Sequence, residues 1–411
     1  MSGSGPLVLI EPNAHRLGGH YQTTLAALAT ARPGSVVITP SGLAADPAPL
    51  RAAGTRLVSG ARGPMAAVLL AAARGALAVS RAGQRAFASR RWPLALRRAP
   101  HQVTLVARCL TEAACLHTAR RLVRDPASVV VLTASEALHG AAALLGGQPH
   151  LRFVHEQVTT EDTPVRLLGR LAQRGEKRVM ALYPTAAVRE EHAAAFPRLP
   201  GMVRAFAVDD GSRLTDAERT AAREAFGIPS NAVAVSVVGS WWPCKDIATI
   251  DAALPRVRTP LHLLVLTGSP LDEAVLHRWQ SLPRIRAHIV RGPVAETDLR
   301  RIYAASSAVL VARRPGEGKE SGLAMDAARH GVPLLVSDHD PHLTAQLAGR
   351  SWARVFPAGD PAGLAAAFDR LATRPLATPA PGDGRVLGMA PAAEQAAFLT
   401  DLYHDLIKER P

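Results

Sequence analysis

Short apolar runs rich in Val, Ile and Leu alternate with longer alanine-rich helical patterns along almost the whole chain, and this alternation most constrains the fold. Continuous apolar runs without a strict polar alternation are typical of parallel strands that helices cover on both faces. The pattern therefore predicts an α/β protein built from doubly wound sheets. The predicted strands are Leu7–Ile10, Ser35–Ile38, Val129–Thr133, Leu151–His155 and Arg178–Tyr183, followed by Val233–Gly239, His262–Thr267, Arg286–Val290, Ala308–Ala312 and Pro333–Ser337.

The chain has 411 residues, which exceeds one ordinary domain and favours two. A break falls between Phe196 and Asp210, where Pro197, Pro200 and Gly201 interrupt the helical pattern. We expect a first domain over residues 1–200 and a second over 201–385. A final helical segment within residues 390–411 follows a Pro- and Gly-rich stretch and is long enough to leave its own domain.

Composition narrows the class of protein. Hydrophobic residues make up 48% and charged residues 20%, as in a soluble globular protein. The three cysteines, Cys109, Cys115 and Cys244, form no Cys-x-x-Cys pair, so we expect neither disulfides nor a thiolate zinc site, and a cytoplasmic location. The N-terminal residues lack the pattern of a signal peptide. The most apolar stretch, Met65–Val79, is interrupted by Arg74, and we expect no transmembrane helix.

The formal net charge of +14 raises the question of a polyanionic partner. Most of this charge is arginine in an alanine-rich chain, a bias typical of a G+C-rich bacterial genome. With only 4% aromatic residues and no basic helix-turn-helix, we expect no nucleic-acid partner. Arginines do concentrate between Arg74 and Arg124, and this part-amphipathic segment is compatible with peripheral contact to an anionic membrane.

The block from Glu317 to Asp338 carries the strongest motif. It predicts an acidic loop, a helix that begins at Ser321, and a Gly-Val-Pro turn into a buried strand. Backbone N–H groups around Ser321, Gly322 and Leu323 can donate to a phosphate or sugar oxygen. A carboxylate one or two turns into the helix, Asp326, can accept hydrogen bonds from two vicinal ribose hydroxyls.

This block resembles the C-terminal signature of GT-B glycosyltransferases, especially the large retaining family 4, whose pattern is Glu-x7-Glu followed by Gly-x-Pro. Here Asp326 replaces the second glutamate, and Glu317 lies one residue further away than the pattern requires. The resemblance implies that Asp326 binds the nucleotide ribose and that Glu317 or Glu320 lies near the donor sugar. An ordinary strand–helix loop with a solvated acidic end is the alternative.

A second block, Val237–Asp246, ends a buried strand at Gly239 and places Lys245 six residues later. It resembles the family's Val-Gly-Arg-Leu-x-x-x-Lys-Gly segment, in which an arginine and a lysine hold the donor diphosphate. Lys245 matches the lysine, whereas Ser240 occupies the arginine position. Lys319, Arg313 or Arg314 would then supply the second cation, or diphosphate binding is weakened.

In the first half of the chain, Gly18 and Gly19 follow the first predicted strand, and His20 and Tyr21 follow them where a helix opens. By resemblance this is the glycine-rich loop that faces the donor phosphate, with His20 and Tyr21 toward the acceptor; a simple tight turn is the alternative. His155, at the end of a predicted strand, resembles a family histidine that contacts the transferred sugar. A structural hydrogen-bonding role is equally compatible with that position.

The resemblance implies a GT-B architecture, in which two facing Rossmann-like domains bind acceptor and donor and the last helix packs back on the first domain. It implies a hexosyltransferase-type enzyme that moves a sugar from a nucleotide-sugar to an acceptor hydroxyl with retention of configuration, in specialised metabolism or glycoconjugate synthesis. We expect a small-molecule or a lipid-linked acceptor. No metal-ligand spacing, P-loop or Gly-x-Ser-x-Gly motif occurs, and we expect no cofactor or metal. A sugar-nucleotide epimerase and a non-catalytic GT-B protein remain alternatives.

Overall fold

A computed structural model describes residues 5–14, 20–43, 48–87, 89, 91–122, 127–135, 139–146, 148–155, 179–209, 213–239, 244–267, 272–292, 295–318 and 320–408. The chain divides into two compact units, which we describe separately. The first comprises residues within 1–16, 21–206 and 391–411, and the second spans Ala207–Ala390. The division falls at Phe206, inside the segment where Pro197, Pro200 and Gly201 interrupt the helical pattern.

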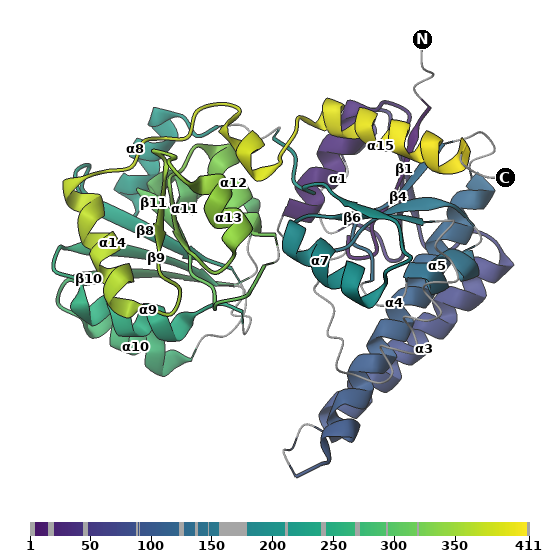
Figure 1. Ribbon diagram of the computed structural model, residues 1–411, viewed down its shortest axis with the longest axis horizontal. Coiled ribbons are helices and arrows are strands. Elements are labelled where there is room, and N and C mark those ends of the chain that lie inside the picture. The colour runs from purple at the N-terminus through teal and green to yellow at the C-terminus, as the bar shows by residue number, and fades with distance from the viewer. Residues whose placement is uncertain are drawn as a thin grey trace. The chain divides into compact units, whose positions relative to one another are not determined.

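The first unit is built on a parallel sheet with the strand order β3-β2-β1-β4-β5-β6-β7 (Figure 1). The central strands β1, β2, β4 and β5 are buried along their whole length, as expected for a sheet with helices on both faces. Its elements are β1 (Leu7–Ile10), α1 (His20–Ala31), β2 (Val36–Thr39), α2 (Ala48–Ala52), β3 (Arg56–Ser59), α3 (Pro64–Ala86), α4 (Leu94–Leu122), β4 (Ser128–Val131), α5 (His139–Gly146), β5 (His150–Phe153), β6 (Val179–Tyr183), α7 (Ala186–Ala195), β7 (Gly201–Val203) and α15 (Ala392–Lys408).

The C-terminal helix α15 belongs to this first unit and contacts β4 and β5. Gln395 fixes it to the end of the sheet: its Oε1 accepts from Arg204 Nε at 2.6 Å, and its Nε2 donates to the carbonyl of Ala205 at 3.1 Å. The Arg204 guanidinium also lies 4.3 Å from the centre of the Phe398 ring. The last helix therefore completes the unit in which the chain began.

The second unit has a parallel sheet with the order β10-β9-β8-β11-β12-β13. Its elements are α8 (Asp216–Ala225), β8 (Val233–Val238), α9 (Ile247–Ala253), η2 (Leu254–Arg256), β9 (Leu261–Thr267), α10 (Glu273–Ser281), β10 (Ile285–Arg291), α11 (Glu296–Ala305), β11 (Ala308–Val311), α12 (Gly322–His330), β12 (Leu334–Ser337), α13 (Pro341–Leu347), β13 (Ala353–Phe356), α14 (Pro361–Thr373) and η3 (Asp383–Leu387). Two apolar clusters, one on each face, bury the sheet beneath α8, α11 and α12 and beneath α9, α10 and α14. The predicted α/β doubly wound class is confirmed.

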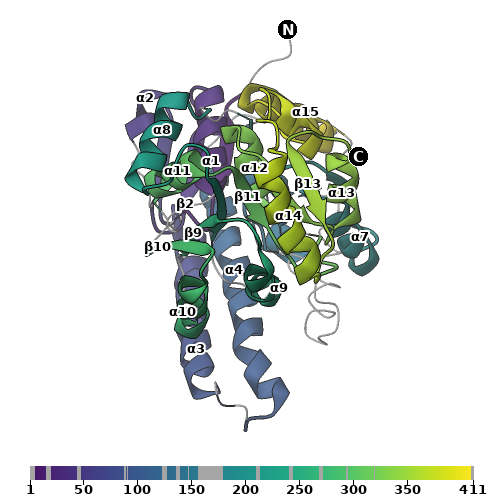
Figure 2. The same cartoon turned by 90° about the vertical axis from the view of Figure 1, so that its left-hand side faces the viewer.

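Helices α3 and α4 of the first unit form a long antiparallel hairpin that runs out beyond the sheet, as Figure 1 and Figure 2 both show. Within the described part of the chain, α3 is long and apolar enough to cross a membrane by length and composition alone. The expectation of no transmembrane helix rested on residues 65–79, but the helix continues to Ala86. Its length therefore no longer excludes a span.

Candidate functional site

The candidate site of the second unit lies at the carboxyl ends of β8 and β11. These strands are neighbours, but the chain leaves β8 toward β9 on one side and returns through β11 on the other. The strand order therefore reverses at this point, which is where open parallel sheets bind their ligands. The loops that follow the two strands are joined by an isolated antiparallel bridge between Lys245 and Arg313.

Lys245 lies directly against the end of β8. Its Nζ donates to the carbonyl of Val238, and the ammonium lies over Gly239. Gly239 has a φ of 102°, which favours glycine, and a Cβ at this position would lie 2.9 Å from Nζ, so the lysine end would have to shift. Burial, and secondarily the charge of Arg313, lowers the pKa of Lys245 to about 8.

Arg313 links the end of β11 to the two segments that follow it. Its backbone N–H donates to Ser337 Oγ at 3.0 Å, at the end of β12, and its Nη2 donates to the carbonyl of Glu320 at 3.2 Å. Burial lowers the pKa of Arg313. A guanidinium nevertheless stays charged in proteins. The fold thus holds two cationic side chains together at the sheet edge, where they attract an anion.

The segment after β12 completes this edge. Ser337 Oγ and His339 Nδ1 are 2.9 Å apart, and His339 is buried. Burial first and Arg313 second lower the pKa of His339 to about 4, so its ring is neutral at pH 7. Asp340 is also buried and caps α13 through a 2.9 Å bond from the His342 N–H. The sequence reasoning did not consider Ser337, His339 or Asp340; their position directly after a buried strand was the available signal.

The predicted helix at Ser321 is confirmed as α12. Ser321 is its N-cap, and its hydroxyl accepts from the Ala324 N–H at 3.4 Å. Gly322 and Leu323 are the first two helical residues, so their N–H groups lie at the positive end of the helix. Gly331, at a φ of 73°, ends the helix before Val332, Pro333 and strand β12.

The two acidic candidates before this helix differ in burial. Glu320 is 9% exposed, and its backbone carbonyl accepts from Arg313. Glu317 is half-buried in the loop after β11, and its charge raises the pKa of Arg313 against the effect of burial. Both glutamates therefore lie on the Arg313 side of the site. Ser240 and Lys319 lie outside the described residues.

Asp326 points into the interior between α12 and α11. Its Oδ1 accepts from Arg329 Nη2 at 2.7 Å, and its Oδ2 accepts from the Tyr303 hydroxyl at 3.4 Å. Burial dominates and raises the pKa of Asp326 to about 6. That Asp326 binds the nucleotide ribose stays a prediction. The ribose hydroxyls would have to share the carboxylate with Arg329 and Tyr303, which already donate to it.

In the first unit, His155 follows β5 and is 8% exposed. Its Nε2 donates to the carbonyl of Leu132 at 3.0 Å, and its ring packs edge-on against Phe206 with the centroids 4.5 Å apart. This bond joins the ends of β4 and β5 and gives the histidine a structural role; contact with a sugar stays a prediction. Gly18 and Gly19 lie outside the described residues. His20 and Tyr21 open α1, and their side chains are likewise outside the described set.

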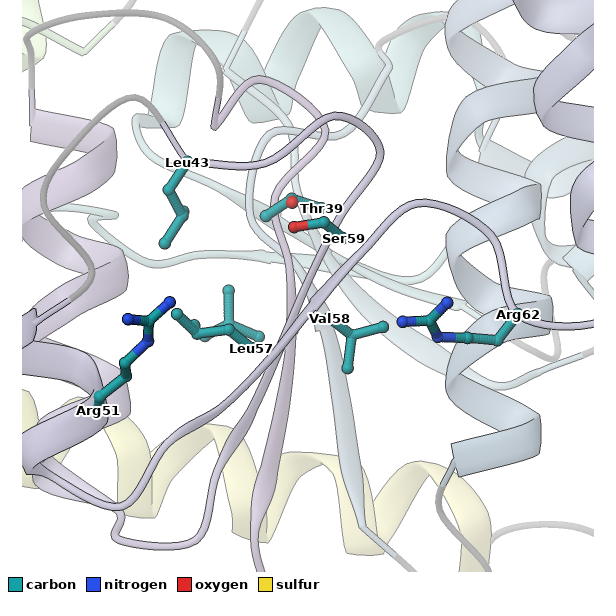
Figure 3. A pocket seen from close by; sticks show the side chains of 8 residues that line it. Thr39, Leu43, Arg51, Leu57, Val58, Ser59 and Arg62 are labelled. Carbon is teal, nitrogen blue, oxygen red and sulfur yellow. The ribbon is translucent and has the colours of Figure 1, made fainter.

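A cavity of about 380 Å³ opens at the carboxyl ends of β2 and β3 in the first unit. Figure 3 shows the hydroxyls of Thr39 and Ser59 close together, with Arg51 and Arg62 on opposite sides. Val37, Leu43, Leu57 and Val58 complete the lining. Hydroxyls and guanidinium groups around an apolar floor suit a polar or anionic small molecule. The sequence reasoning missed this cavity because β3 was not among the predicted strands.

Comparison with known proteins agrees with this geometry. The family model described as "Glycosyl transferases group 1" matches residues 232–374, which contain Gly239, Lys245, Arg313 and all of α12. The second unit is a group 1 glycosyltransferase domain. No curated protein matches the chain.

Solved structures with the same fold extend over the whole chain. Anabaena HepE, in complex with UDP and glucose, has a TM-score of 0.62 at 13% identity and covers 98% of this chain and 100% of its own. A UDP-forming trehalose-phosphate synthase from Burkholderia xenovorans has a TM-score of 0.59 at 14% identity, with coverage of 98% and 99%. The N-terminal domain of Candida albicans trehalose-6-phosphate phosphatase has a TM-score of 0.63 at 10% identity, with coverage of 99% and 97%. At these identities the likeness establishes the GT-B fold.

Proposed function

We propose that this glycosyltransferase takes its sugar from a nucleotide-sugar donor, whose diphosphate binds between Lys245 and Arg313. The observation that carries the proposal is the backbone bridge that places Lys245 and Arg313 side by side at the reversal point of the second sheet, close enough for the charge of Arg313 to lower the pKa of Lys245. Arg313 would fill the role that Ser240 leaves open in the family's arginine–lysine pair. UDP and UDP-glucose in the structures of HepE, which has the same fold, support a donor of this chemical class.

The protonation states fit the binding of an anion. With a pKa of about 8, Lys245 is mostly protonated at pH 7, and the arginine beside it is always charged. Two cations at one sheet edge repel each other in the empty site, and a diphosphate relieves that repulsion. The N-terminus of α12, at Gly322 and Leu323, supplies further N–H donors to a phosphate or sugar oxygen.

The chemistry that this edge supports is departure of the nucleoside diphosphate. As the bond between the anomeric carbon and the phosphate oxygen breaks, negative charge grows on that oxygen, and Lys245 and Arg313 stabilise it. Retention of configuration, with the leaving phosphate taking the proton of the acceptor hydroxyl, belongs to this proposal. So do the role of Glu317 and Glu320 near the sugar and the role of Asp326 at the ribose.

The acceptor side of the proposal is the first unit. A small-molecule or lipid-linked acceptor hydroxyl fits a unit whose cavity carries Thr39 and Ser59 between two arginines. We propose a cytoplasmic, metal-independent enzyme of specialised metabolism or glycoconjugate synthesis, with membrane contact through the Arg74–Arg124 segment. In the described part of the chain, no group of three or more His, Cys, Asp or Glu side chains is arranged to hold a metal.

The test is release of nucleoside diphosphate from UDP-, GDP-, dTDP- and ADP-sugars in the presence of an acceptor panel. Lys245→Ala should lower turnover by more than about tenfold, and Arg350→Ala, on an exposed turn of the same unit, should not. NMR of the product's anomeric proton reports retention or inversion. Turnover undiminished in Lys245→Ala would refute the role of the lysine. Donor breakdown or epimerisation without acceptor would point to an epimerase or hydrolase.

A further inference from the structure

The far part of the α3–α4 hairpin extends beyond the sheet of its unit (Figure 1 and Figure 2). At 1.5 Å per residue, α3 is about 35 Å long and α4 about 43 Å. The far end of the hairpin holds together by its own contacts: Ser80 Oγ donates to the carbonyl of Pro100 at 2.7 Å, and a Cβ on Gly83 would lie 2.9 Å from the Pro100 ring. The C-terminal half of α4 packs on the sheet and on α5.

Apolar side chains concentrate on the outside of this hairpin. Seven of the ten large hydrophobic residues that are exposed in the described part of the chain lie on it. Three of them, Trp92 (38% exposed), Leu94 (53%) and Leu96 (39%), follow one another at the tip. Phe87 packs edge-on against Trp92 with the centroids 5.3 Å apart. The tip, which we define as the described residues between 79 and 98, therefore presents an aromatic and leucine-rich surface to solvent.

The charged side chains on the same surface are all positive. Exposed arginines at the tip are Arg81, Arg85, Arg91, Arg97 and Arg98. Between Pro64 and Leu122 the sequence has one acidic residue, Glu112, which is buried and ion-paired to Arg152 at 2.6 Å. The outer surface of the hairpin thus carries arginine without any carboxylate. Packing of a second copy on this surface would bring like charges together, which disfavours self-association.

Exposed Trp and Leu beside arginine, without acidic side chains, fit the headgroup region of an anionic bilayer. Trp rings favour the membrane–water interface, leucine enters the acyl boundary, and arginine heads bind lipid phosphates while their stems lie along apolar surface. Although α3 alone is apolar enough to span a membrane, its partner α4 carries Arg97, Arg98 and Arg108. Those arginines favour a hairpin that lies on the membrane surface over one that crosses it.

We infer that the tip of the α3–α4 hairpin docks this glycosyltransferase on an anionic lipid bilayer, with Trp92 and Leu94 inserted at the interface. This inference stands apart from the donor site, since vesicle binding requires neither donor nor turnover. It replaces the broad proposal of membrane contact through Arg74–Arg124 with one surface, the hairpin tip, and with one partner, an anionic bilayer.

Co-sedimentation of the full chain with vesicles tests it. We expect binding to phosphatidylcholine vesicles that contain about a quarter phosphatidylglycerol, weak binding to phosphatidylcholine alone, and release when salt rises from about 0.1 M to about 0.5 M. Brominated lipid should quench the fluorescence of Trp92, and the quenching should be lost in Trp92→Phe.

Two tip variants with matched controls assign the surface. Trp92→Ser/Leu94→Ser should weaken vesicle binding by at least about tenfold, and Leu144→Ser/Leu145→Ser, an exposed pair on α5, should leave it unchanged. Arg97→Gln/Arg98→Gln should also weaken it by about tenfold, and Arg256→Gln/Arg350→Gln in the second unit should not.

Three results would overturn the inference. The protein could bind neutral and anionic vesicles equally, both tip variants could bind vesicles as well as the wild type does, or the protein could bind no vesicles at all. A dimer in solution that Trp92→Ser/Leu94→Ser dissociates, without vesicle binding, would assign the tip to a second copy instead. Donor binding in all of these variants checks that the second unit is intact.

Discussion

At the scale of single residues, the proposed donor site depends on Lys245 and Arg313. The lysine was identified from its spacing after Gly239, whereas Arg313 was one of three possible partners with Lys319 and Arg314. The pairing of β8 with β11 places the backbone of Arg313 beside that of Lys245, and sequence separation gives no hint of that pairing. The backbone N–H of Arg314 helps to form this bridge by donating to the carbonyl of Cys244 at 3.1 Å, but its side chain is exposed.

The depressed pKa of Lys245 predicts a pH dependence of donor binding. Because a diphosphate binds the protonated lysine, nucleoside diphosphate affinity should fall as pH rises through about 8. Lys245→Arg, which stays charged, should flatten this fall. Isothermal titration between about pH 6.5 and about 9.5 measures the nucleoside diphosphate affinity of the wild type and of Lys245→Arg. Identical pH profiles for the two would contradict the role of the lysine.

The raised pKa of Asp326 predicts that stability, too, falls as the pH rises, but in a lower pH range. Its pKa rises to about 6 on folding, so its stabilising contribution is complete below the unfolded pKa of about 4 and is lost as pH rises through 6. Relative to Asp326→Asn, the wild-type second unit should therefore lose stability between pH 4 and 6. Urea unfolding at several pH values checks the difference. A constant difference would show that the carboxyl does not titrate there.

At the scale of elements, the burial of a strand determined whether the sequence pattern predicted it. Strands with four or more buried residues, such as β1 and β8, read as apolar runs and lie within one or two residues of their predicted bounds. The missed strands are β3, β7 and β13, which are all edge strands with at most one buried residue each. Edge strands need fewer apolar residues, so their signal is too weak to separate from a loop.

The same contrast between burial and exposure predicts which ion pairs hold elements together. Glu112 on α4 and Arg152 on β5 form a pair at 2.6 Å with side chains that are 1% and 0% exposed. Arg152→Ala should destabilise the first unit by about 3–5 kcal/mol, because it leaves a buried carboxylate without its partner. Hydrogen exchange, which resolves the two units, measures the loss.

The matched control is the pair between Arg278 and Asp251, which has the same 2.6 Å separation but lies on the surface. Arg278→Ala should cost the second unit no more than about 1 kcal/mol. Equal losses in the two variants would show that burial does not set the strength of these pairs.

At the scale of the whole molecule, the chain has the GT-B fold, and residues 232–374 of its second unit match a group 1 glycosyltransferase model. The sequence predicted some parts of the two units and missed others. The α/β class followed from the alternation of apolar runs and helices, and α12 followed from its cap and its Gly-x-Pro exit. The cavity after β2 and β3, the Ser337–His339 edge and the hairpin tip depend on strand order and on helix packing. Those contacts join residues that are far apart in the sequence, so no local sequence pattern predicts them.

The most direct test of the central claim is isothermal titration of UDP into wild type, Lys245→Ala, Arg313→Ala and the control Arg350→Ala, repeated with GDP, dTDP and ADP. The account predicts that one nucleoside diphosphate binds wild type and the control equally, and that each site variant weakens its affinity by at least about tenfold. Failure of all four nucleotides to bind wild type, or unchanged affinity in both Lys245→Ala and Arg313→Ala, would contradict it.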